Sequence, residues 1–339
     1  MGKKLTVILG AGASHDLVAT QVGWIQPNYT PPLTAELFQA RTEFSDILKR
    51  YPGAMSLGAT VATRIKQGQS LEDVLRSMLD RGEDHVIPRL GQVPFYLQHL
   101  LGEISEQYTA EPVNYSRLIT DILGPEYDKV ALVTLNYDLF LEKSLAAIER
   151  KPVTSLDSFA EPDRKWMLVK LHGSVNWGRR VEGAVSKNHD HGNMLKFASE
   201  IRIKEGPPNE ISVQNAYSDR WSGDELLYPV MAMPLAGKYD HMCPEDHVDA
   251  LKEFLGSCPN FLIIGVSGKD DDLLNLLTEN VVRCDQVEIV GGAHVDEVYE
   301  RIAETFLQIR AAQKELRRNG FSRFILTGQL DDFLSRLVD

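Results

Sequence analysis

A glycine-rich segment near the start of the chain has residue types that can hold a phosphate group. The segment consists of Gly10, Ala11, Gly12, Ala13 and Ser14. Its two glycines let the backbone turn sharply and approach a phosphate, while amides at the start of a following helix and the Ser14 hydroxyl can donate to it. The third glycine of the dinucleotide-binding fingerprint is missing, because His15 stands in its place. A tight strand-to-helix turn without a ligand is therefore the alternative.

Two further clusters carry an amide, a carboxylate and an imidazole. Asn136 and Asp138 follow an apolar run, and two residues that are two apart in an extended segment point the same way. They can present both polar groups to one small ligand. His172 follows another apolar run and precedes Gly173, where an imidazole can act as a base near neutral pH. The alternatives are helix capping by Asn136 or Asp138 and a structural role for His172.

Apolar runs and helical periodicity alternate along the chain. Apolar runs predict buried strands at residues 6–9, 130–135, 167–171, 261–264 and 287–290. Helical spacing predicts helices at residues 33–51, 93–108, 139–148, 295–318 and from 271 onward. The alternation is typical of an α/β, Rossmann-like, doubly wound parallel sheet, here of about six strands. Because ligands bind outside the carboxyl ends of such strands, the polar clusters should face one crevice.

We expect one domain over residues 1–339 with two inserts. Residues 52–125 carry almost only helical signals and predict a helical insert subdomain. Residues 178–225 are polar, with scattered Gly, Asn and Pro, and predict a loop-rich insert with a weak strand or two.

The order of the polar clusters resembles the sirtuin superfamily. The segments GAGAS at 10–14, TLNYD at 134–138 and KLHGS at 170–174 are followed by Gly265-Val266-Ser267, as in that family. The similarity spans residues 7 to about 292, so the single domain is expected to be a sirtuin-like catalytic domain. The joint pattern is much more specific than any one of its parts.

The resemblance implies that NAD is the substrate. It places the pyrophosphate at the glycine turn and assigns Gly265 and Ser267 to the phosphate and ribose region. It places Asn136 against the nicotinamide ribose and the reacting water, Asp138 near the nicotinamide amide, and makes His172 the catalytic histidine. Cleavage would release nicotinamide and leave an oxocarbenium-like ribose, as in glycoside hydrolysis.

The chain departs from the protein-deacylating sirtuins in several places. It has no paired cysteines for their zinc ribbon, and Leu135 stands where they carry Gln. Their acyl-lysine peptide lies along an extended segment after the G-x-S motif, whereas residues 268–274 here, with Asp270–Asp272, predict a capped helix start. Gly291-Gly292 replaces their adenine-side asparagine. These departures favour hydrolysis of NAD over deacylation.

Residues 31–34 resemble the bacterial defence-associated branch of the superfamily. That branch implies an NADase that depletes NAD during phage infection, acts as a homo-oligomer and is controlled by a separate sensor or ATPase partner. The alternatives are an NAD-dependent protein deacylase and an inactive scaffold that binds NAD or ADP-ribose.

Composition limits the remaining classes. A formal net charge of -12 argues against direct nucleic-acid binding, which needs a basic face. Three scattered cysteines fit a reduced, cytoplasmic protein. The apolar run at the N-terminus is too short for a signal peptide or a membrane span. His241, Cys243 and His247 have metal-ligand types but lack a fourth ligand, so we expect no metal.

Overall fold

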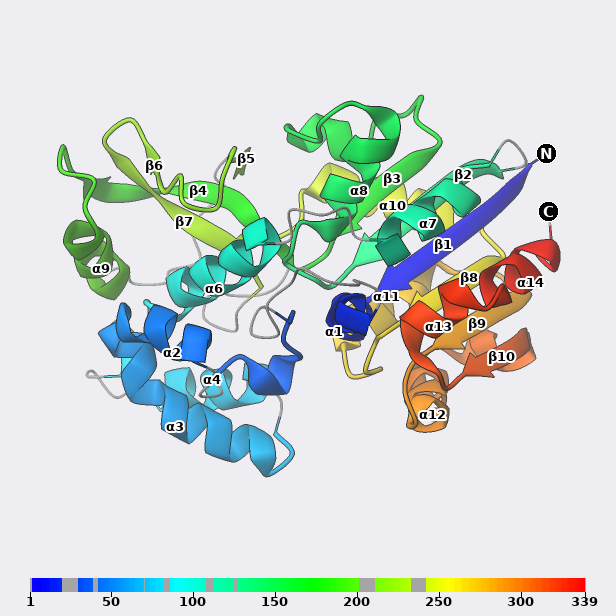
Figure 1. Cartoon of the computed structure of the whole chain (residues 1–339), viewed down its shortest axis with the longest axis horizontal. Coiled ribbons are helices and arrows are strands. Elements are labelled where there is room, and N and C mark those ends of the chain that lie inside the picture. The colour runs from blue at the N-terminus through cyan, green and yellow to red at the C-terminus, as the bar shows by residue number, and fades with distance from the viewer. Residues whose placement is uncertain are drawn as a thin grey trace.

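A six-stranded parallel sheet organises the core of the computed structural model (Figure 1). The structure describes residues 2–19, 30–38, 42–69, 71–81, 86–107, 113–124, 127–200, 211–232 and 242–338. The strand order is β10-β9-β8-β1-β2-β3, and every neighbouring pair is parallel. The strands are β1 (Lys3–Leu9), β2 (Tyr127–Thr134), β3 (Trp166–Lys170), β8 (Asn260–Ile264), β9 (Gln286–Val290) and β10 (Gln313–Arg317). The predicted doubly wound parallel sheet is confirmed, and the order in which its strands are added reverses between β1 and β8.

Alternation along the central strands divides the core into two layers. Leu5, Val7 and Leu9 point into one hydrophobic cluster, whereas Ile8 points into the other. The helices of the first layer are α7 (Val113–Ile122), α8 (Phe140–Glu149), α13 (Gly320–Leu326) and α14 (Gln329–Ser335). The helices of the second layer are α10 (Glu245–Leu255), α11 (Asp271–Asn280) and α12 (Val295–Thr305). Both faces of the sheet are therefore covered, which explains its continuous apolar strands.

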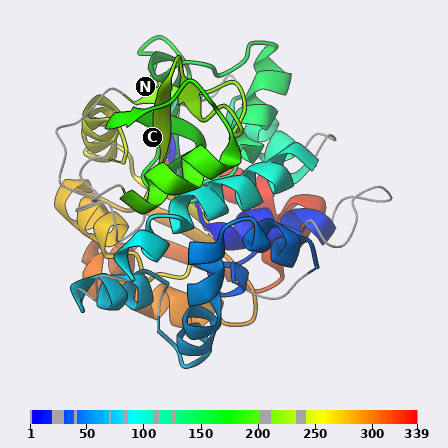
Figure 2. The ribbon, with the colours of Figure 1, turned by 90° about the vertical axis from the view of Figure 1, so that its left-hand side faces the viewer.

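A second body of structure, here called the insert lobe, lies beside the parallel sheet (Figures 1 and 2). Its helices are α2 (Thr42–Lys49), α3 (Pro52–Lys66), α4 (Leu71–Asp80), α5 (Ile87–Leu90), α6 (Val93–Gln107) and α9 (His191–Glu200). Its antiparallel sheet consists of β5 (Ser212–Val213), β4 (Gly173–Val185), β7 (Glu225–Met231) and β6 (Trp221–Ser222). Helix α6 packs on this sheet, where the Phe95 and Tyr228 rings meet edge to face at 5.5 Å.

The loop-rich interpretation of residues 178–225 was wrong. These residues contain most of β4, the whole of α9, and strands β5 and β6. Strand β4 pairs with β7 about fifty residues later, with Arg179 opposite Tyr228 and Arg180 opposite Leu227. Only its first half is fully buried, and its polar residues give no apolar run. A strand stabilised by a distant partner is poorly visible in local periodicity.

Two predicted helices also need correction. Residues 295–318 form α12, then a 3-10 turn at Leu307–Ala311, then β10. Among the described strands, β10 is a charged edge strand beside β9, so its exposed side chains show no apolar run. Residues 33–51 form a 3-10 turn at Thr34–Glu36 and the helix α2, with residues 39–41 outside the described ranges.

The remaining short helices lie close to the sheet: α1 (Ala11–His15), η1 (Asp16–Ala19) and η4 (Leu156–Phe159). In the described ranges, no helix is both long and apolar enough to cross a membrane.

Candidate functional site

The turns after the neighbouring strands β1 and β8 pack backbone against backbone, where the strand order of the sheet reverses. The Gly12 amide donates to the Gly265 carbonyl at 3.0 Å, and the Ala13 amide donates to the Gly10 carbonyl at 2.9 Å. A Cβ on Gly12 would lie 2.8 Å from Gly265 Cα, and one on Gly265, whose φ is +65°, would lie 2.2 Å from the Ala13 nitrogen. Glycine is therefore required here by this close approach. Two amides that the sequence suggested for a phosphate are used within the protein.

Ser14 is a shared partner for several of the predicted site residues. Its hydroxyl donates to Asp138 Oδ2 at 2.7 Å and lies 3.0 Å from the Tyr115 hydroxyl. Asn136 Nδ2 donates to Ser14 Oγ at 3.1 Å and to the Gly10 carbonyl at 2.9 Å. Because the hydroxyl proton of Ser14 goes to Asp138, its role in this structure is to join the ends of β1 and β2.

Asn136 is held by its backbone as well as by its side chain. Its amide donates to Thr134 Oγ1 at 3.0 Å, and the residue is 7% exposed. Leu139, not Asn136, is the N-cap residue of α8. Asp138 Oδ1 accepts from the Phe140 amide at 3.3 Å, so Asp138 partly satisfies the start of that helix. The capping alternative thus applies in part to Asp138 and does not apply to Asn136.

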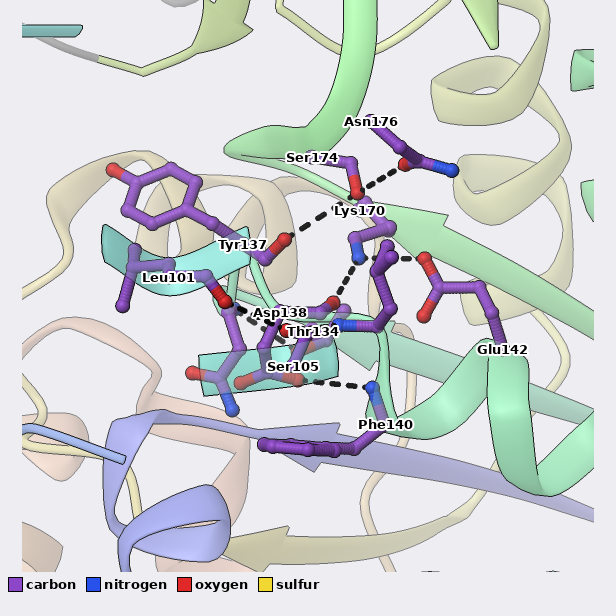
Figure 3. Close-up of polar contacts among 12 residues, drawn as sticks. Leu101, Ser105, Thr134, Tyr137, Asp138, Phe140, Glu142, Lys170, Ser174 and Asn176 are labelled. Atoms are coloured by element: carbon purple, nitrogen blue, oxygen red, sulfur yellow. Dashed lines mark hydrogen bonds and ion pairs between the residues drawn. The ribbon is translucent and has the colours of Figure 1, made fainter. Parts of the chain in front are cut away.

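A fully buried lysine supports the Asp138 turn (Figure 3). Lys170 Nζ donates to the Asp138 carbonyl at 2.5 Å and forms an ion pair with Glu142 Oε1 at 2.7 Å. Burial raises the pKa of Asp138, and the charge of Lys170 and the Ser14 hydroxyl oppose that shift. Burial likewise raises the pKa of Glu142 against the attraction of Lys170. Asp138, Lys170 and Glu142 therefore form a buried charge network beside the predicted site residues.

His172 lies on the two-residue connection that joins the parallel sheet to the antiparallel sheet. Its carbonyl accepts from the Ala232 amide at 2.7 Å, and the Tyr137 ring lies 6.1 Å from its imidazole ring. The next residue, Gly173, has a φ of +79°, and a Cβ there would lie 2.1 Å from the Val230 carbonyl. Glycine after the histidine is thus a requirement of the passage from β3 into β4.

A carboxylate that the sequence analysis treated only as a helix cap contacts the imidazole. Asp270 Oδ2 lies 2.8 Å from His172 Nε2, while Asp270 Oδ1 accepts from the Leu273 amide at 2.8 Å and caps α11. Burial alone would raise the pKa of Asp270, but His172 and the Leu273 amide together lower it. In the sequence, Asp270 is the first of three consecutive aspartates. Helix capping accounts for them, so a contact with His172 was not predicted.

The structure brings most of the predicted residues to one edge of the sheet. Gly10, Ser14, Asn136 and Asp138 are joined by hydrogen bonds, and His172 neighbours them through Tyr137. The Ala13 side chain is buried in the core, so only its backbone could meet a ligand.

The other predicted positions are more open. Ala11 is partly buried. The Gly265 carbonyl accepts from the Gly12 amide. Ser267 is exposed, and its carbonyl accepts from Arg301. Arg301 is a cation beside the β8 turn that sequence reasoning did not single out. Tyr115 and Lys170 were also missed. Tyr115 lies on α7, away from the strand-end clusters, and Lys170 opens the KLHGS segment but lies in the run that predicts a buried strand.

No group of three or more metal-ligating side chains converges within the described ranges. Cys243 is buried, and burial raises the pKa of its thiol, which disfavours the thiolate that binds metals. His247 Nε2 lies 3.1 Å from the Leu156 carbonyl. His241 lies outside the described residues.

Comparison with known proteins gives a family match over part of the chain. Residues 130–283 match the family described as the SIR2-like domain, which confirms the resemblance to the sirtuin superfamily. The matched range contains Asn136, Asp138, His172 and Asp270. In a search of curated proteins, no sequence matches the chain.

Among solved structures, the chain is similar to two Sir2 homologues. A Sir2 homologue mutant in complex with ADP-ribose has a TM-score of 0.43 and 13% identity, covering 100% of this chain and 96% of that chain. A Sir2 homologue–NAD complex has a TM-score of 0.43 and 11% identity, covering 99% of this chain and 91% of that chain.

Proposed function

We propose that this chain hydrolyses NAD to nicotinamide and ADP-ribose. The observation that carries the proposal is that Asn136, Asp138 and His172 lie at the carboxyl ends of the neighbouring strands β2 and β3, with a carboxylate against the imidazole. In a doubly wound sheet this edge is where ligands bind. The SIR2-like match over the same residues supports NAD as that ligand.

For this reaction the protein has to orient the substrate and supply one base. The bond between ribose C1′ and the nicotinamide nitrogen breaks, and the bonding pair leaves with nicotinamide, which neutralises its ring charge. Water attacks C1′ of the oxocarbenium-like ribose, and its proton goes to His172. Asn136 and Asp138 would orient the ribose and the leaving carboxamide.

The start of α11 supports hydrolysis over deacylation. Asp270 contacts His172 from the segment that follows β8. In the protein-deacylating sirtuins the acyl-lysine peptide lies along the corresponding segment. Asp271 and Asp272 follow Asp270 in the first turn and are exposed, so negative charge surrounds this approach. A short capped helix in that place leaves no extended edge to pair with a peptide strand.

Nicotinamide release from NAD, followed with and without an acetylated peptide, separates the three functions that the sequence leaves open. Release without peptide supports the NADase. Release only with peptide, together with peptide deacetylation, establishes a deacylase instead. Binding of NAD or ADP-ribose without any release establishes a scaffold.

His172→Ala should lower the rate of nicotinamide release by at least roughly 100-fold, the usual contribution of a positioned acid or base. His99→Asn is the matched control, because His99 is also buried but lies in the insert lobe. An unchanged rate in the folded His172→Ala protein would refute its catalytic role.

We extend the proposal to a biological setting through the resemblance of residues 31–34 to defence-associated sirtuin-like proteins. The chain would deplete NAD in an infected bacterium, as a homo-oligomer controlled by a separate sensor or ATPase protein. Cellular NAD measured after expression, with His172→Ala as control, tests the depletion. Mass photometry of the purified protein tests the oligomer, and a monomer at all concentrations would contradict it.

A further inference from the structure

Asp270 contacts His172 from a different part of the fold. His172 follows β3 at one edge of the sheet, whereas Asp270 begins α11, which follows β8. Strands β1 and β2 lie between β8 and β3 in the sheet, so the turn after β8 reaches past two strand ends to meet the imidazole. Such a contact is a tertiary feature and does not follow from capping α11.

Each oxygen of the Asp270 carboxylate has its own partner. Oδ1 accepts the Leu273 amide and Oδ2 meets His172 Nε2, both at 2.8 Å. The Asp270 side chain is 18% exposed and the His172 side chain 12% exposed, so water screens the contact only weakly. The helix start therefore fixes the carboxylate, and the carboxylate fixes the ring.

The histidine is restrained on its other sides as well. Its carbonyl is bonded to the Ala232 amide, and the Tyr137 ring packs beside the imidazole. Tyr137 is itself anchored, because its hydroxyl donates to the Ala232 carbonyl at 2.9 Å. The imidazole thus has one orientation supported by three separate segments of the chain.

We propose that Asp270 is a positioning residue, which holds His172 with a proton on Nε2 so that Nδ1 is the atom that accepts a proton during NAD cleavage. The inference rests on the proposed function. A carboxylate at one ring nitrogen stabilises the tautomer with hydrogen on that nitrogen and the imidazolium that forms after proton transfer. Asp270 itself keeps its negative charge and transfers no proton.

Asp270→Asn tests the charge while keeping the helix start, because asparagine caps helices as well as aspartate does. We expect kcat for nicotinamide release to fall roughly 100-fold, with KM for NAD changed less than about threefold, since general acid–base catalysis contributes on that scale. Asp271→Asn is the matched control. It removes the same charge one residue later, from an exposed side chain, and should keep wild-type kcat. Asp270→Ala should lower kcat further and also destabilise α11.

The tautomer gives a readout that needs no turnover. The ¹⁵N shifts of the His172 ring, assigned by their loss in His172→Gln, should show hydrogen on Nε2 in the wild type and in Asp271→Asn. They should show a changed or mixed tautomer in Asp270→Asn. Hydrogen on Nδ1 in the wild type, or the same tautomer in all three proteins, would overturn the proposal.

The outcomes also separate this proposal from the proposed function. If His172→Ala abolishes cleavage while Asp270→Asn retains wild-type kcat, the NADase stands and the positioning role fails. If Asp270→Asn is faster than the wild type, the contact is an inhibitory one and the proposal fails. If the wild type shows the Nε2–H form but releases no nicotinamide from NAD, the proposed function fails on its own.

Discussion

Two largely buried histidines, one in each region, have different surroundings. His172, at the edge of the parallel sheet, has a carboxylate 2.8 Å from its ring. His99, on α6 in the insert lobe, has the Tyr51 hydroxyl 3.0 Å from Nδ1 and a stacked Tyr217 ring. Burial lowers the pKa of His99 to about 4, and the charges of Arg220 and Arg50 add to that effect.

This difference teaches how to separate a candidate base from a core histidine. Both side chains are largely buried, so burial alone does not distinguish them. The partner does: a carboxylate stabilises a ring that gains a proton, whereas burial together with the charges of Arg220 and Arg50 keeps the His99 ring neutral. His172 therefore has the surroundings of a group suited to proton transfer, whereas His99 has those of an imidazole that serves packing.

Breaking the buried ion pair between Lys170 and Glu142 should have the largest effect on stability. Lys170→Met leaves Glu142 buried and without its cation, so the free energy of unfolding should fall by about 3–5 kcal/mol. Urea unfolding followed by circular dichroism measures this. Lys49→Met, which removes an exposed partner of Asp46, should leave the unfolding midpoint nearly unchanged.

The double variant Lys170→Met/Glu142→Leu sharpens the result. It should recover part of the lost stability, because Glu142 no longer lacks its cation, whereas the buried Asp138 carboxylate still lacks the charge of Lys170. It should not recover activity, because the bond from Lys170 to the Asp138 carbonyl is still missing. Full activity in the double variant would show that the site does not depend on this support.

Asn136→Ala should lower turnover by roughly 100-fold or more, as for an oriented polar group that acts on the transition state. Its affinity for NAD should change much less. The control is Asn260→Ala at the amino end of the sheet. Asn260 is also buried and donates to the Lys4 and Val338 carbonyls. The Asn260→Ala variant should be less stable but should keep the wild-type rate of nicotinamide release per folded molecule, as measured by single-turnover kinetics.

The strand ends were the part of the fold that the sequence predicted well. Buried parallel strands need continuous apolar runs, so β1, β2, β3, β8 and β9 were visible, and their order along the chain brought Asn136 and His172 to one edge. Strands with one exposed face or a distant partner, such as β4 and β10, gave no such run.

The contacts between strand ends were the part of the site that the sequence did not predict. The pairing of Ser14 with Asp138 and of His172 with Asp270 spans 124 and 98 residues respectively, and depends on the order of strands in the sheet. The same dependence explains why Gly12 and Gly265 are required. Each was expected to contact a phosphate. In the folded chain, a Cβ on either residue would instead collide with the backbone of the other turn.

His99→Asn tests the histidine of the insert lobe, and its effect on stability near neutral pH should be the smallest of those predicted. The pKa of His99 is about 4 in the folded protein and near its usual 6.5 in the unfolded chain. Between these values the unfolded state binds more protons, so His99 makes the protein less stable as pH falls from 6.5 toward 4. The slope is at most about 1.4 kcal/mol per pH unit. Burial also lowers the pKa of His191, which adds to the same slope.

Asparagine at position 99 keeps a polar atom near the Tyr51 hydroxyl and removes the titrating ring. We therefore expect the free energy of unfolding of His99→Asn to fall less steeply than that of the wild type between pH 7 and pH 5. This window lies above the titration of neighbouring Glu103, whose pKa is lowered by Gln107 and Tyr217 although burial alone would raise it. Each protein is compared with its own value at pH 7, so any constant loss from the smaller side chain cancels. Urea unfolding at half-unit pH steps measures the two slopes. Equal slopes would show that His99 is not a neutral core histidine, and the contrast with His172 would then have to rest on Asp270 alone.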